Sequence, residues 1–354
     1  MNKSAFNNMT IYYFSGTGNA KKVAEWIQET AEQQKVKTDI INITTMEKRK
    51  LESIPESSVL GFCSPTHGFN YPPIMLHFIF RFPKSKGNKI FLLNTRAGLK
   101  AGKFFIAGLS GVALLLSALI LKIKGYKIIG MRSIDLPSNW ISLHPGLKPE
   151  TVESIFIKRK EDTLDFTRKL LAGKKVYTAF KDIVQDLLIA PIAILYYIIG
   201  RFVLAKTFIA SKDCTHCNLC VEKCPINAIK IIDDRCFWTH KCESCMQCMN
   251  LCPHRAIETV HGFIIGLSIF IYNVILIKLY SILNIKKLIT NYVSNGASEY
   301  ILSIFNSIMY LTILFLGYWI LHYLLRFRFF ERIFVLTSFT KYKFWRRYKP
   351  PRKF

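Results

Sequence analysis

Short apolar runs alternate with longer amphipathic stretches along the first half of the chain. The strand-like runs lie at residues 10–14, 38–43, 59–63, 89–94 and 126–132. Helical patterns separate these runs, and this alternation is typical of βαβ units built around a parallel sheet. The pattern predicts an α/β fold with a five-stranded, doubly wound parallel sheet that ends near Gly173, after a charged helix.

The run at residues 104–121 has no charged side chain over 18 positions. Its length alone is that of a transmembrane helix. It lies between the fourth and fifth predicted strands, however, and a crossing here would leave the fifth strand on the far side of the bilayer, unable to pair. We therefore predict the fourth crossover helix of the sheet, made apolar by contact with a bilayer or another apolar segment.

Longer apolar runs occupy the last third of the chain. Residues 263–283 contain one charge, Lys278, and residues 301–325 contain no formal charge. Each is long enough to cross about 30 Å of hydrocarbon, so we predict a transmembrane helical hairpin. His322 is expected to be an interfacial or hydrogen-bonded residue rather than a haem ligand. The uncharged run at 187–200 is shorter and contains Pro191, which favours an interfacial or packed helix.

Nine of the ten cysteines fall between positions 214 and 252, and eight of these form two runs with the same spacing. Each run reads C-x2-C-x2-C-x3-C-P, the spacing of bacterial two-cluster ferredoxins, in which the fourth cysteine of each run ligates the other cluster. We predict two 4Fe-4S clusters, one held by Cys214, Cys217, Cys220 and Cys252, and one held by Cys242, Cys245, Cys248 and Cys224. Zinc is the alternative, although zinc sites usually use two CxxC pairs. Cys63 and Cys236 are expected to be structural, with Cys236 also a candidate for a spare thiol near a cluster.

A loop of small residues, Ser-Gly-Thr-Gly-Asn at 15–19, stands between the first strand and the following helix. It lacks the Gly-Lys-Ser/Thr of a Walker loop and the third glycine of a dinucleotide fingerprint. Its amides and hydroxyls, at a helix N-terminus, can still converge on a phosphate. The loop resembles the FMN phosphate loop of flavodoxins.

That resemblance implies that two further loops at the carboxyl edge of the sheet hold the isoalloxazine ring. Phe69 and Tyr71 would stack on the ring, and the backbone of residues 94–98 would meet its polar edge. The alternative is that the aromatic residues and His67 only pack the loop. The implied FMN-binding residues are Ser15, Gly16, Thr17, Gly18, Asn19, Pro65, Thr66, His67, Gly68, Phe69, Tyr71, Asn94, Thr95, Arg96, Ala97 and Gly98.

The arrangement as a whole resembles bacterial iron-sulfur flavoproteins of the EFR-type ferrodoxin family over about residues 8–262. The expected organisation is a flavodoxin-like FMN-binding domain at 8–173, an apolar helical connector at 174–209 and a two-cluster ferredoxin domain at 210–260. Two transmembrane helices at 261–325 and a basic aromatic tail at 326–354 follow. The resemblance implies electron transfer between FMN, the two clusters and a redox partner.

The formal net charge of +26 bears on the partner. No nucleic-acid recognition module accompanies the basic residues, many of which flank apolar runs, so we expect a membrane and no nucleic acid. The tail after Leu325 carries ten Lys or Arg against one Glu, whereas the loop at 284–300 carries two Lys against one Glu. The positive-inside rule therefore places the flavodoxin domain, the ferredoxin domain and the tail on the cytoplasmic side of the cytoplasmic membrane. The aromatic residues of the tail would lie against the anionic inner leaflet.

Two other functions stay open from the sequence. One is a flavin-dependent reductase acting directly on a quinone or a small substrate, with Trp140 and His144 near the flavin edge. The other is a ferredoxin whose flavodoxin-like domain is empty and serves for docking. No catalytic acid or base is identified, which favours an electron carrier whose redox partner is an unknown protein or a quinone.

Overall fold

The computed structural model describes residues 4–46, 58–284, 295–345, 347–349 and 351. The chain forms two compact units, each described here by itself. Unit 1 consists of Met1–Tyr197, Cys245–Asn250 and Arg346–Phe354, and unit 2 consists of Ile198–Ser244 and Leu251–Trp345.

Unit 1 is built on the predicted parallel sheet. Its strands are β1 (Asn8–Tyr13), β2 (Lys37–Asn42), β3 (Ser58–Pro65), β4 (Lys89–Ala101) and β6 (Lys127–Pro137), in the spatial order β2-β1-β3-β4-β6. The prediction of a parallel α/β fold is confirmed. Because β3 is buried along almost its whole length, its apolar run is continuous rather than alternating.

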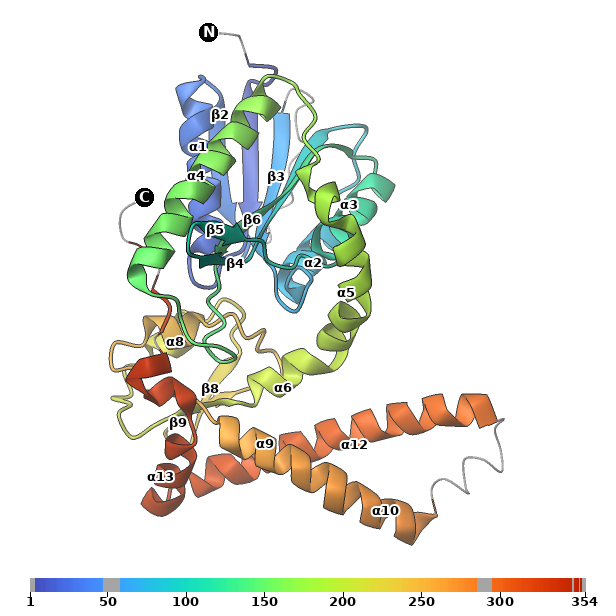
Figure 1. Cartoon of the computed structure of the whole chain (residues 1–354), viewed down its shortest axis with the longest axis vertical. Helices are drawn as coiled ribbons and strands as arrows, with labels where there is room; N and C mark the ends of the chain where they lie inside the picture. The colour runs from blue at the N-terminus through green and yellow to red at the C-terminus, as the bar shows by residue number, and fades with distance from the viewer. Residues whose placement is uncertain (1–3, 47–57, 285–294, 346, 350, 352–354) are drawn as a thin grey trace. The chain divides into compact units, whose positions relative to one another are not determined.

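Helices cover both faces of this sheet (Figure 1). Helices α1 (Asn19–Gln33) and α4 (Pro149–Leu171) pack together on one face, where the Trp26 and Phe156 rings lie 5.9 Å apart. Helices α2 (Pro73–Arg81) and α3 (Ala113–Ile123) lie on the other face, over a core that includes Phe62 and Phe82. The carboxyl ends of the parallel strands are thus left open at one edge, where ligands of such sheets bind.

The sequence predicted one helix over the apolar run at 104–121, but the run forms a strand and a shorter helix. Residues Phe104–Ile106 form strand β5, which pairs antiparallel with the end of β4. Gly102, with φ of +57°, makes the turn between them. Helix α3 begins only at Ala113 and has 11 residues. The prediction missed β5 because three residues are too few to show strand periodicity.

The connector after α4 is a continuous helical segment in which many apolar side chains are exposed and an acidic side chain is buried. It contains η1 (Thr178–Asp182), α5 (Ile183–Leu195), η2 (Tyr196–Gly200) and α6 (Arg201–Ala205). Leu188 is 77% exposed, whereas Asp186 is 4% exposed and accepts a 2.9 Å hydrogen bond from the Gly111 amide. The segment Thr178–Ala205 is long and apolar enough to cross a membrane. In the part of this segment that belongs to unit 1, Asp186 is therefore turned inward, whereas apolar residues such as Leu188 are exposed.

Replacing Asp186 with asparagine is expected to stabilise unit 1 at neutral pH. Burial raises the pKa of Asp186, although the Gly111 amide and Arg96 act in the opposite direction. A carboxyl group whose pKa is raised by folding contributes stability that is lost as pH rises through the folded-state pKa. Asparagine keeps the acceptor for the Gly111 amide and removes the charge. Melting temperatures of D186N and the parent should therefore diverge as pH rises and converge in acid.

The control for this comparison is the exposed carboxylate Asp39, in Asp39→Asn. That variant should melt within a degree or two of the parent throughout the pH series, since exposed charges contribute little. If D186N instead melts below the parent at every pH, the prediction is wrong. The negative charge of Asp186, and not only its ability to accept the Gly111 hydrogen bond, would then stabilise unit 1.

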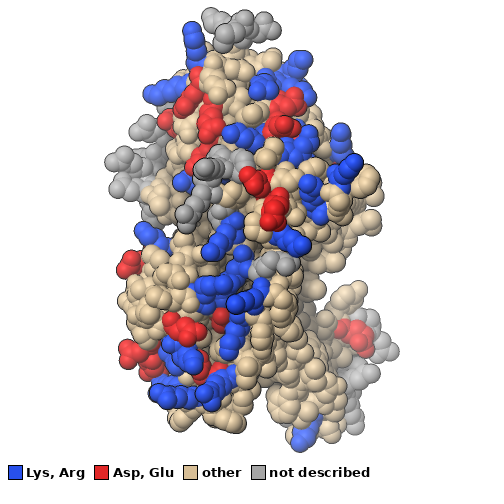
Figure 2. All heavy atoms as spheres, turned by 60° about the vertical axis from the view of Figure 1, so that its left-hand side comes forward, with Lys and Arg blue, Asp and Glu red and all other residues tan. Residues whose placement is uncertain are grey.

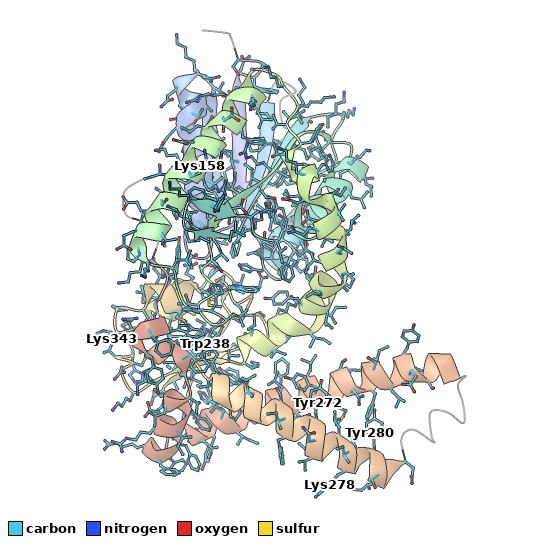
Figure 3. The ribbon with its side chains drawn as sticks, viewed as in Figure 1. Lys158, Trp238, Tyr272, Lys278, Tyr280 and Lys343 are labelled. Carbon is cyan, nitrogen blue, oxygen red and sulfur yellow. The ribbon has the colours of Figure 1, made fainter. Side chains whose placement is uncertain are left out.

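Unit 2 contains two short antiparallel strand pairs. Strand β7 (Phe208–Ala210) pairs with β10 (Ile257–Thr259), and β8 (Ile229–Ile232) pairs with β9 (Arg235–Trp238). Helix α7 (Leu219–Glu222) begins two residues after the second cysteine of the first run. Helix α8 (Gln247–Leu251) begins at the same position of the second run, and most of it is grouped with unit 1. Trp238, labelled in Figure 3, is fully buried at the end of β9.

Two apolar helical segments in unit 2 run antiparallel. The first comprises α9 (His261–Phe270), η3 (Ile271–Ile275) and α10 (Leu276–Leu283), and the second is α12 (Asn295–Leu324). The Ser268 and Tyr310 hydroxyls lie 2.9 Å apart, and the Tyr280 hydroxyl donates to Asn306 at 2.6 Å. Figure 3 shows Tyr272 and Tyr280 between the segments, and the region they form is almost uncharged on the face seen in Figure 2. Both segments, His261–Ile282 and Ala297–Leu324, are candidate membrane spans.

The basic tail folds against unit 2, which the sequence did not predict. It forms α13 (Arg328–Leu336), η4 (Phe339–Lys341) and η5 (Lys343–Trp345). Buried Thr340 donates to Glu258 and accepts a 3.0 Å hydrogen bond from the Thr259 amide, while buried Glu331 accepts one from the Lys212 amide at 2.9 Å. This part of the tail is thus a folded element of unit 2, and its contact with the inner leaflet stays a prediction. Tyr348, within unit 1, is also buried, and its hydroxyl donates to Asn19.

Candidate cofactor sites

The loop at residues 15–19 forms a tight turn into helix α1. Gly18 is the residue before the helix and has φ of +101°, a left-handed conformation that favours glycine. Its amide donates to the Ser15 hydroxyl at 3.1 Å. Asn19 donates to the Pro137 carbonyl at 3.0 Å, and Asn139 donates to the Thr17 hydroxyl, so the loop after β6 supports this turn. The geometry is that of an anion site at a helix N-terminus.

A cavity of about 420 Å³ opens beside this loop, within unit 1. Its wall comes from four more segments, at residues 65–69, 95–99, 107–109 and 137–144. The volume lies within the usual range for cofactor pockets, roughly 300–1,000 Å³. The residues predicted from the sequence that line the cavity are Ser15, Gly16, Thr17, Asn19, Pro65, Thr66, Gly68, Phe69, Thr95, Arg96 and Ala97.

Five predicted site residues lie outside this lining. Tyr71 is fully buried in the core, and its hydroxyl donates to the Leu93 carbonyl at 2.7 Å, so it does not present a ring to the cavity. Asn94 donates to the Thr66 hydroxyl at 2.7 Å and thereby supports the lining from behind. The others are Gly18, His67 and Gly98. His67 is buried with its ring 5.7 Å from that of Trp140.

Arg96 is the centre of a buried ionic network that the sequence did not show. Its Nε donates to Asp135 at 2.6 Å and its Nη1 donates to Asp182 at 2.6 Å. Asp135 also accepts the Gly108 amide at 2.8 Å, which fixes the loop at 107–109 on the cavity wall. These partners lie far apart in sequence and belong to no motif, so only the fold reveals them. The network thus positions the backbone of the 107–109 loop on the cavity wall. Through Asp182 it also connects this wall to the start of the connector.

The loop after β6 supplies Trp140 and His144 to the cavity. His144 Nδ1 lies 3.0 Å from the Pro145 carbonyl, which can only accept, so Nδ1 carries the proton. In the neutral ring, Nε2 then accepts the Ser138 hydroxyl at 2.7 Å. Both ring nitrogens of His144 are thus engaged. The Trp140 ring lies 5.5 Å from Tyr196, and Tyr196 also packs directly on Gly68, so the connector supports this wall of the cavity.

Four predicted ligands of the first cluster surround one hollow in unit 2. These residues are Cys214, Cys217, Cys220 and Cys252, and Cys236 lines the same hollow. Among the described residues, no three Cys, His, Asp or Glu side chains lie so that they could hold a single metal ion. The cysteines line a space rather than meeting at a point, and this arrangement suits a cluster better than tetrahedral zinc.

The second predicted set is divided between the units. Cys224 and Cys242 lie in unit 2, whereas Cys245 and Cys248 belong to the segment grouped with unit 1. Burial, and to a smaller extent the neighbouring Cys224, raise the pKa of Cys242 to about 12. Binding to iron requires the thiolate, so loading this set releases protons.

The two cysteine runs have left-handed residues at the same positions. In the first run, the second and fourth residues after the first cysteine, His216 and Asn218, have φ of +56° and +57°. In the second run the corresponding residues, Ser244 and Met246, have φ of +52° and +61°. Amides four residues after the last cysteines also donate to sulfur, Ala228 to Cys224 at 3.2 Å and Ala256 to Cys252 at 3.3 Å. Left-handed backbone is rare outside glycine, so its repetition marks two copies of one motif.

Comparisons with known proteins agree with this division. A flavodoxin family model matches residues 11–104, and a 4Fe-4S binding domain model matches residues 208–230. No curated protein matches the chain.

Similar solved structures include flavodoxin 1 from Bacillus cereus, with 17% identity, a TM-score of 0.31 and coverage of 46% of this chain and 97% of that one. A flavodoxin from the domain Archaea has 16% identity, a TM-score of 0.29 and the same coverage. Megasphaera elsdenii flavodoxin has 17% identity and a TM-score of 0.29, covering 44% of this chain and 98% of that one.

The chain thus contains a flavodoxin domain and a 4Fe-4S binding domain. Flavin and iron-sulfur cofactors in one chain indicate an electron-transfer protein.

Proposed function

We propose that this chain is a membrane-anchored protein that passes electrons between FMN and two 4Fe-4S clusters, to or from a redox partner. The repeated backbone of the two cysteine runs is the observation that carries the proposal, because it extends the 4Fe-4S motif beyond residues 208–230. FMN exchanges two electrons with a donor or acceptor, whereas each cluster passes one at a time. The similarity to EFR-type ferrodoxins supports the same role.

The cavity of unit 1 suits FMN. The amides and hydroxyls of residues 15–19 would hold the phosphate at the start of α1. Phe69 and Trp140, which both line the cavity, would flank the ring, and Phe69 takes the role that the sequence also gave to Tyr71. Arg96, with its charge engaged by two aspartates, holds backbone amides in place.

The contacts of unit 2 favour a membrane hairpin. Helix α9 starts directly after β10, and the segment that follows α12 returns to the same place, where the Phe339 amide donates to His261 at 3.2 Å. The two ends of the apolar region are therefore joined. If its helices cross a bilayer, they must cross an even number of times, as a hairpin does.

The connector is better explained as an interfacial helix than as a third span. Near its start, Asp182 and Asp186 accept hydrogen bonds from Arg96 and the Gly111 amide of unit 1. The uncharged part that remains, residues 187–200, would cover about 21 Å at 1.5 Å per residue, less than the roughly 30 Å of hydrocarbon. An interfacial position also leaves the flavin and the clusters on the same side of the membrane.

Topology can be tested by labelling single cysteines in intact cells. The tail after Leu325 carries more positive charge than the loop at 284–300, most of which lies outside the described residues, so we expect the tail and both cofactor domains to be cytoplasmic. A cysteine at Asn295 should react with an impermeant maleimide and one at Pro350 should not. Reaction at Pro350 alone would invert the orientation, and recovery of the protein in the soluble fraction would exclude a membrane hairpin.

Cofactor content and internal electron transfer test the function. Protein purified without oxygen should yield about one FMN and about eight irons per chain. Reduction of the flavin by light should be followed by bleaching of the cluster absorbance in the same chain. Flavin without such bleaching would favour a reductase that acts directly on its substrate, and clusters without flavin would favour a docking role for unit 1.

The engagement of His144 bears on the reductase alternative. Both ring nitrogens of His144 are hydrogen-bonded, one to a carbonyl that only accepts. A general acid or base at this wall would have to break one of these bonds first. This favours the electron carrier.

A further inference from the structure

One cysteine outside the predicted ligand sets lies against a predicted ligand. The Cys236 and Cys220 sulfurs are 3.5 Å apart, within the range of a sulfur hydrogen bond. Cys236 is 7% exposed, stands on β9 and lines the same hollow as the four cysteines of the first set. Its place is fixed by the pairing of β9 with β8, in which Cys236 lies opposite Ile231.

The direction of this hydrogen bond follows from iron binding. A cysteine that ligates iron must be deprotonated, so Cys220 can only accept once the cluster is in place. Cys236 is not part of either C-x2-C-x2-C-x3-C run, so iron does not remove its proton. The contact is therefore S–H of Cys236 to the sulfur of Cys220.

The thiol has no counterpart at the matching position of the other run. Cys236 stands six residues before Cys242, the first cysteine of its run, and the residue six before Cys214 is Phe208. A phenyl ring has no proton to donate to sulfur. One backbone contact is the same in both runs, since Ala228 and Ala256 make the same amide contact to Cys224 and Cys252. In the second run the Ser244 amide also donates to Cys242, at 3.4 Å. The thiol of Cys236 is thus one difference between the two sites.

We propose that Cys236 tunes the cluster held by Cys214, Cys217, Cys220 and Cys252, by donating a hydrogen bond to Cys220 that raises the reduction potential of this cluster. Adding an electron makes the cluster and its sulfurs more negative. A donor to sulfur therefore stabilises the reduced form more than the oxidised form. The inference rests on the proposed function, since it requires both clusters.

The test is a redox titration of the intact, cluster-loaded protein, followed by electron paramagnetic resonance. Three variants are compared with the parent: Cys236→Ala, which removes the donor; Cys236→Ser, which keeps a hydroxyl donor; and Cys63→Ala, which removes a fully buried thiol in unit 1. We expect C236A to lower the potential of one cluster and leave the other unchanged, with the iron content intact. C236S should restore most of the shift, and C63A should change neither potential.

Each other result has a distinct meaning. Full iron with both potentials unchanged in C236A would overturn the proposal, and so would an equal shift of both clusters. Loss of about four irons in both C236A and C236S would show that Cys236 is itself a ligand and would also overturn it. If C236A alone lost iron, C236S would decide, because a retained hydroxyl donor predicts potentials close to those of the parent. A parent protein with one cluster, or none, would instead refute the proposed function.

Discussion

Replacing Cys224 with alanine is expected to remove the cluster whose other ligands are Cys242, Cys245 and Cys248, although Cys224 belongs to the other run. In the two-cluster ferredoxin pattern the fourth cysteine ligates the other cluster. In unit 2, Cys224 is close enough to Cys242 to raise its pKa. Iron content should therefore fall from about eight to about four per chain.

Paired variants identify the cluster that is lost. Cys245→Ala and Cys217→Ala each remove a ligand whose assignment does not depend on crossing. The resonance spectrum and potential of the cluster that remains in C224A should match those in C245A and differ from those in C217A. A match with C217A would mean that each run holds its own cluster. Cys252→Ala provides the mirror experiment, with the opposite match.

Replacing Gly18 with valine is expected to weaken flavin binding and leave the irons in place. Gly18 has φ of +101°, which a β-branched residue adopts only at a cost. That cost is on the order of 1–3 kcal/mol, or about 5- to 150-fold in affinity if it acts on the loop alone. The amide of Gly18, which now donates to Ser15, would also be turned from its present direction. Extracted flavin per chain and iron per chain are the two measurements.

Gly102→Val is the matched control, because it tests the same kind of strain away from the cavity. Gly102 has φ of +57°, is exposed and has nothing within 4 Å of an added Cβ. This variant should lose stability but keep its flavin. Normal flavin content in G18V would refute the assignment of residues 15–19 to the phosphate. Equal loss of flavin in both variants would show that strain anywhere in unit 1 releases it.

Local patterns were enough to predict several parts of this protein. The spacing of eight cysteines defines the ferredoxin motif, because three thiolates within seven residues can meet one cluster without any long-range contact. The apolar runs predict the parallel sheet, because buried strands need continuous apolar side chains. The loop at 15–19 could be placed at a helix N-terminus because the strand and the helix beside it in the sequence are also beside it in space.

Other features were decided by tertiary structure. Tyr71 and Phe69 stand two residues apart, yet one is a core residue and the other lines the cavity, because the turn at 67–70 directs them differently. Arg96 is engaged by Asp135 and Asp182, which are 39 and 86 residues away. The folded part of the tail is hydrogen-bonded to Thr259, whose amide donates to Thr340, 81 residues further along the chain. Composition and spacing cannot report such contacts, because they depend on which distant segments the fold brings together. The sequence by itself thus determined the cofactors to be expected, and the tertiary structure determined which side chains face them.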